Sequence, residues 1–101
     1  MDLDKLAERI VPGKAVLLES GELEALLAAA RIVEERDTLV SGLIRILEWK
    51  GRVLVQEFTD KEEPVLRETA SLEEARRFVE ERMRTYEKMW DGCGCKVDYF
   101  E

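Results

Sequence analysis

The stretch SLEEARRFVEERMRTYEKMWDGCGC, residues 71–95, combines a helix start, a long amphipathic pattern and a stop. Ser71 and Glu74 have the spacing of a capping box, in which the Ser71 hydroxyl accepts from the Glu74 amide and the Glu74 carboxylate from the Ser71 amide. Apolar residues then recur at helical spacing over about five turns, with charged residues between them. Gly92 follows, and glycine readily adopts the left-handed conformation that ends many helices. The pattern predicts a long C-terminal helix over residues 71–91.

Four strand-like segments precede this helix. Residues 52–58, RVLVQEF, have the β-branched and aromatic content of a strand, and Lys50-Gly51 suits a two-residue turn with Gly51 at positive φ. We therefore predict a hairpin of residues 42–49 and 52–59, followed by a third strand over 64–69. Residues 38–49 also fit a helical stripe, so strand and helix stay open there. The same two alternatives apply to residues 15–19, which we interpret as a strand.

The sequence pattern predicts two helices in the N-terminal part of the chain. Asp2 or Asp4 can cap a short helix that reaches Ile10, and the Val-Pro-Gly sequence after it favours a turn. A second helix is expected from Ser20 to about Glu35, because its apolar residues recur at helical spacing around an alanine run. The chain is thus predicted to be one α+β domain, residues 1–101, in which a small antiparallel sheet, a central β-hairpin plus a third strand, is backed by helices.

The predicted hairpin is apolar on both faces, which is unusual for a sheet with one solvated side. One face carries Ile44, Ile46, Val53 and Val55, and the other carries Leu43, Leu47, Trp49, Leu54 and Phe58. The C-terminal helix can cover one face, so the other needs the N-terminal helices or a second subunit. The second possibility predicts a homodimer, with an interface made of Trp49, Leu43, Leu47, Leu54, Phe58 and Trp90. Coverage of both faces within one chain is the equal alternative.

Composition limits the classes of partner. The chain has a net charge of −7, and its arginines are interleaved with acidic residues. Both features disfavour binding to nucleic acid. No apolar run approaches the ~20 residues that span a bilayer. The N-terminus lacks a signal-peptide pattern, so cytoplasm is the expected compartment. The chain has no Asn, one Gln and abundant Glu, a composition typical of thermophilic proteins.

The absence of His excludes Ser-His and Cys-His nucleophilic pairs and His-ligated zinc. Cys93-Gly94-Cys95 is the remaining chemical signal, because two sulfurs at this spacing can converge on Zn(II) or Cu(I) or form a readily reduced disulfide. Two thiolates leave a tetrahedral zinc half-coordinated, so a closed site needs the same pair from a second chain. The alternative is that both thiols are incidental to the function.

Two functional hypotheses follow, and a conventional enzyme is not favoured. The first is a small, acidic, non-enzymatic interaction module that associates with itself as a homodimer or binds an unidentified protein partner. The second is a soft-metal-binding or thiol-redox protein that uses Cys93 and Cys95. An enzyme based on a desolvated Glu or Tyr has no positive support in the sequence.

Overall fold

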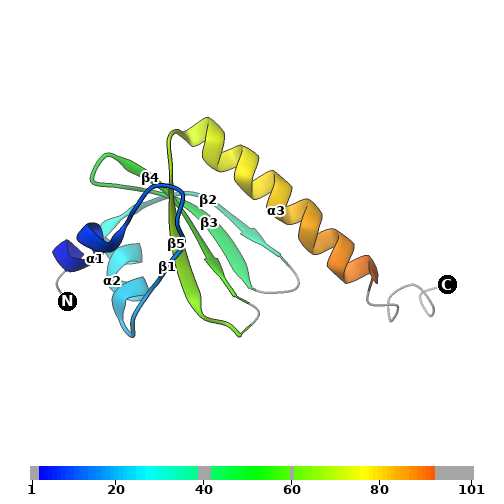
Figure 1. Cartoon of the computed structure of the whole chain (residues 1–101), viewed down its shortest axis with the longest axis horizontal. Helices are drawn as coiled ribbons and strands as arrows, with labels where there is room; N and C mark the ends of the chain where they lie inside the picture. Colours follow the sequence, from blue (N-terminus) through cyan, green and yellow to red (C-terminus); the bar gives the residue numbers. More distant parts are fainter. Residues whose placement is uncertain (1–2, 39–41, 60, 93–101) are drawn as a thin grey trace.

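The chain folds into one antiparallel sheet with helices on both faces, as an α+β protein. The computed structural model describes residues 3–38, 42–59 and 61–92, with side chains up to residue 88. Its elements are α1 (Leu3–Arg9), β1 (Val16–Leu17), α2 (Glu22–Ala29), β2 (Arg31–Asp37), β3 (Leu43–Trp49), β4 (Arg52–Phe58), β5 (Pro64–Thr69) and α3 (Leu72–Gly92). The five strands lie in the order β1-β5-β4-β3-β2, and the sheet separates α1 and α2 from α3 (Figure 1).

The β3–β4 hairpin has the predicted two-residue turn. Trp49 pairs with Arg52, and Lys50 and Gly51 between them have φ values of 52° and 74°. Two positive φ angles in succession match the right-handed twist of the flanking strands. This register fixes the two faces of the hairpin as the sequence predicts, and it decides for strand over helix in residues 43–49. Strand β1 likewise confirms the strand interpretation near residue 16.

The predicted second helix is wrong beyond its second turn. Helix α2 ends at Ala29, Ala30 is extended with φ −94° and ψ 161°, and residues 31–37 form strand β2. Arg and Glu in this segment favour a helix when isolated. Pairing with β3 overrides that preference, since β2 satisfies an otherwise open edge of β3. The sheet therefore has five strands where the sequence indicated four, and β2 is the one that the sequence did not indicate.

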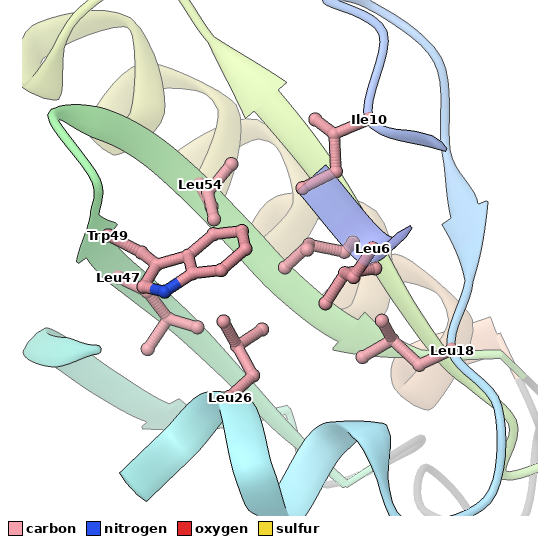
Figure 2. Close-up of a cluster of buried hydrophobic side chains, with 8 residues drawn as sticks. Leu6, Ile10, Leu18, Leu26, Leu47, Trp49 and Leu54 are labelled. Carbon is pink, nitrogen blue, oxygen red and sulfur yellow. The ribbon is translucent and has the colours of Figure 1, made fainter. Parts of the chain in front are cut away.

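Helices α1 and α2 cover one face of the sheet. Figure 2 shows Trp49 of β3 among Leu26 of α2, Leu47 and Leu54, with Leu6 of α1 and Ile10, the residue after α1, nearby. The buried cluster on this face is Leu6, Ile10, Leu18, Leu26, Leu47, Trp49, Leu54 and Leu66. The two short N-terminal helices thus cover the larger of the two clusters of buried hydrophobic residues.

Helix α3 covers the other face, where it packs on Ile44, Ile46 and Val55 through Ala75 and Val79. Its start has the predicted capping bond, from the Glu74 amide to Ser71 Oγ at 3.1 Å. The returning bond differs from the prediction, because the Glu74 carboxylate accepts from the Ala70 amide at 3.0 Å and not from that of Ser71. The C-terminal end of α3 extends past the strands (Figure 1).

Helices α1 and α2 on one face, and α3 on the other, bury most of the apolar side chains of the sheet within this chain. Leu47, Trp49 and Leu54, which the sequence placed in an interface, are at most 5% exposed and lie in the core of this chain. Leu43 and Phe58 are half-buried near the β2–β3 connection. The side chain of Trp90 lies outside the described part of the structure.

The outer edge of β1 is closed by a buried ion pair. Arg9 makes a forked contact with Glu22, with Nη1–Oε2 at 2.7 Å and Nη2–Oε1 at 2.9 Å. Arg9 also donates to the Leu17 carbonyl at 2.9 Å, and Glu22 accepts from the Glu19 amide at 2.7 Å. The Leu17 carbonyl belongs to the edge strand, so its contact with Arg9 opposes the addition of a further strand at this point.

The other edge, β2, is protected by charge. Its residues Glu34 and Arg36 form ion pairs with Arg76 and Glu80 of α3, and Glu35 pairs with Arg45 of β3. A register shift between Ile32 and Glu34 further disrupts the edge. Charged side chains and irregular pairing both oppose edge-to-edge association.

The Arg9–Glu22 pair makes stability depend on pH. The hydrogen bond from Arg9 lowers the pKa of Glu22 below its ordinary value of 4.5, against the opposing effect of burial. A lowered pKa in the folded state stabilises the fold fully above the unfolded value, and this contribution is lost as pH falls through the folded value.

We expect Glu22→Gln to lower the free energy of unfolding at neutral pH by about 2–3 kcal/mol, since it leaves Arg9 without its counter-charge. Urea unfolding of the full chain measures this difference, which should shrink steadily below pH 4.5. Glu73→Gln is the matched control, because its partner Arg77 and Glu73 are both exposed and should contribute under about 0.5 kcal/mol. An equal difference for Glu22→Gln at neutral and acidic pH would contradict the assignment.

Candidate partner-binding surface

A strip of sheet beside α3 carries apolar side chains toward solvent. Leu17 of β1 pairs with Val65 of β5, and Val65 pairs with Glu57 of β4, so these three side chains share one face. Glu57 contacts α3, which shows that this is the face α3 packs on. Leu17 is 52% exposed and Val65 is half-buried. The strip at the β5–β1 edge is therefore an incompletely covered part of that face.

The strip is bordered by the aromatic ring of Phe78, on which two guanidinium groups stack. The ring of Phe78 lies 4.9 Å from Cζ of Arg82 and 5.1 Å from Cζ of Arg67. Phe78 and Arg82 lie one turn apart on α3, and Arg67 lies on β5 two residues after Val65. Stacking of guanidinium on an aromatic face holds both cations in place. Leu17, Val65, Arg67, Phe78 and Arg82 together are called the β1-side surface below.

Arg82 is neutralised by the chain itself. Its Nη2 donates to Glu57 at 3.4 Å, and its Nε lies 3.1 Å from Glu57 Oε1 without the alignment of a hydrogen bond. The Tyr86 hydroxyl also donates to Glu57 at 3.4 Å. Glu57 is only 6% exposed, so this cluster gives a buried carboxylate the partners that it requires.

Arg67 has no such acidic partner in the described part of the chain. Its Nη1 donates to the Gly13 carbonyl at 3.0 Å, and its Nε is buried without any acceptor. Other half-buried arginines, such as Arg9 and Arg45, each pair with a glutamate. Arg67 is thus a positive charge on the β1-side surface that the described chain leaves without a counter-charge.

Two hollows lie close to this region. One of about 150 Å³ is lined by Phe78, Glu81, Arg82 and Thr85. Another of about 320 Å³ lies where β5 leads into α3, and its lining residues include Gly13, Glu68 and Glu74. The buried carboxylates Glu22 and Glu57 line neither hollow, and each is held by an arginine.

The sequence did not single out the β1-side surface. Leu17 belongs to an apolar run of four residues that gives no sign of which side chain faces solvent. Arg67 is one of many arginines among glutamates, and only the fold shows that it has no acidic partner among the described residues. The feature of the sequence that could have indicated this surface is the short length of the apolar run, which is compatible with an edge strand.

The predicted metal ligands Cys93 and Cys95 lie outside the described residues. Within residues 3–38, 42–59 and 61–92, no group of three or more acidic or Cys side chains is placed to hold a metal ion. In the same part of the chain, every helix is too short or too polar to cross a membrane.

The chain matches no protein-family model, no curated protein and no solved structure. Its function is accordingly inferred from its own residues and geometry.

Proposed function

We propose that this protein is a small interaction module that binds a segment of a partner protein through the β1-side surface. The observation that carries the proposal is the exposure of Leu17 beside half-buried Val65, on a sheet face that α3 otherwise covers. An apolar patch bordered by polar groups is typical of a protein-binding site. Arginine and aromatic residues, here Arg67 and Phe78, are the types enriched in such sites.

The occupant is proposed to be a partner's peptide segment, docked beside α3. Addition of a further strand is opposed at β1 by the Arg9–Glu22 pair and at β2 by its charges. The uncompensated charge of Arg67 attracts acidic groups, which supports a partner with carboxylates. We also propose that the protein acts in the cytoplasm.

We expect peptides selected on the full chain from a random displayed library to depend on Leu17. In fluorescence-polarisation titrations, Leu17→Ser should weaken their binding by about tenfold or more, because a buried Leu contributes about 1.5–3 kcal/mol. Ile32→Ser is the matched control, since Ile32 is a strand residue of similar exposure, 44%, on β2. Peptides that bind the Leu17→Ser variant as tightly as the original protein would refute the proposed surface.

Self-association and the thiol hypothesis remain proposals that one measurement addresses. Native mass spectrometry of protein purified without chelator should give a metal-free monomer if partner binding is the main function. A dimer with one zinc per two chains would instead support a shared site of Cys93 and Cys95, and substitution of both by Ser should then remove the metal. A metal-free dimer would support self-association without the thiols.

A further inference from the structure

We propose that Arg67 is an anion-binding subsite that takes a carboxylate from an acidic residue of the partner segment. The inference rests on the proposed function and adds the chemistry of the ligand. Its basis is that Arg67 is half-buried, stacked on Phe78 and lacks an acidic partner among the described residues. Removing a cation from water has a cost that a bound counter-charge offsets.

The surroundings of Arg67 leave its positive charge available. Its Nη1 is held by the Gly13 carbonyl, and this contact with a neutral group positions the guanidinium without neutralising it. Phe78 supports one side of the group at 5.1 Å. The charge is delocalised over all three nitrogens, so a carboxylate at the terminal nitrogens neutralises the guanidinium as a whole, although it does not accept from the buried Nε–H.

Glu57 and Glu68, two acidic residues on strands β4 and β5, are already engaged by other arginines. Glu57 is bound by Arg82 and Tyr86, and Glu68 on β5 faces the opposite side of the sheet, where it approaches Arg52 at 3.9 Å. The competing acid on α3 is Glu81, which lines the small hollow with Phe78 and Arg82. Since Glu81 forms no ion pair with Arg67 in this structure, the subsite is open to an external carboxylate.

The spacing on β5 predicts the sequence pattern of the ligand. Val65 and Arg67 are two residues apart on one strand face, about 7 Å along the strand. An extended segment repeats its side chains on one face at the same interval. A ligand that places an apolar side chain against Leu17 and Val65 should therefore carry Asp or Glu two positions away.

The test uses two peptides, acetyl-Gly-Leu-Ser-Glu-Ser-Gly-amide and the same peptide with Gln for Glu, titrated into the ¹⁵N-labelled full chain. The Leu17 and Val65 amides and the Arg67 Nε–H signal report binding. We expect the Glu peptide to bind about five- to tenfold more tightly than the Gln peptide. The preference should fall as salt rises, because an exposed carboxylate–guanidinium contact is screened.

In Arg67→Gln the preference for the Glu peptide should disappear, whereas Arg84→Gln should keep it. Arg84 is the matched control because it is exposed on α3 and has no ion pair within the described chain. Arg67→Lys, which keeps the charge without the planar fork, should retain part of the preference and guards against a folding defect in the Gln variant.

The outcomes separate this inference from the proposed function. An undiminished preference for Glu in Arg67→Gln would overturn the subsite, while dependence of binding on Leu17 would still support the surface. Equal binding of both peptides by the original protein would also overturn it. Amide shifts that depend on protein concentration alone would identify a second copy as the occupant and refute a peptide ligand.

Discussion

The β3–β4 hairpin imposes the constraint on which the whole molecule depends, because it is apolar on both faces. The Lys50-Gly51 turn fixes its register, and the register sets Leu47, Trp49 and Leu54 on one face and Ile44, Ile46 and Val55 on the other. A shift of one residue would exchange the two sets. Each face requires its own cover, and the chain supplies α1 with α2 for one and α3 for the other.

Polar groups reinforce this arrangement across the sheet. Glu35, Arg45 and Gln56 form a row over β2, β3 and β4, with contacts of 2.6 Å at both steps. Gln56 is fully buried, yet its amide group also donates to the Glu57 carbonyl at 3.0 Å. A polar row that runs from exposed Glu35 to buried Gln56 with satisfied partners favours one register over its alternatives. At the sheet margin, Arg9 acts similarly by occupying the Leu17 carbonyl of the edge strand.

The proposed binding surface lies on a sheet whose two edges oppose strand addition and whose faces are largely covered by helices. With both edges opposed to strand addition and both cores filled within one chain, the strip beside α3 is where apolar and cationic groups reach solvent together. Leu17 and Val65 offer apolar contact, and Arg67 offers charge on a support built by Phe78 and Gly13. A partner segment bound there would cover the part of the sheet face that α3 leaves exposed, which is the proposed role of this surface.

Local sequence patterns determined the hairpin, its turn, the assignment of its faces, and the capped helix α3, because these depend on neighbouring residues and on simple periodicity. Tertiary structure alone decided that residues 31–37 form a strand, since pairing with β3 outweighs the helical preference of Glu and Arg. It also decided that the second face is covered without a second subunit. The ion pairs of individual arginines were also decided by the tertiary structure. Arg9 pairs with Glu22, whereas Arg67 has no acidic partner among the described residues, because ion pairing depends on which side chains the fold brings within a few ångströms.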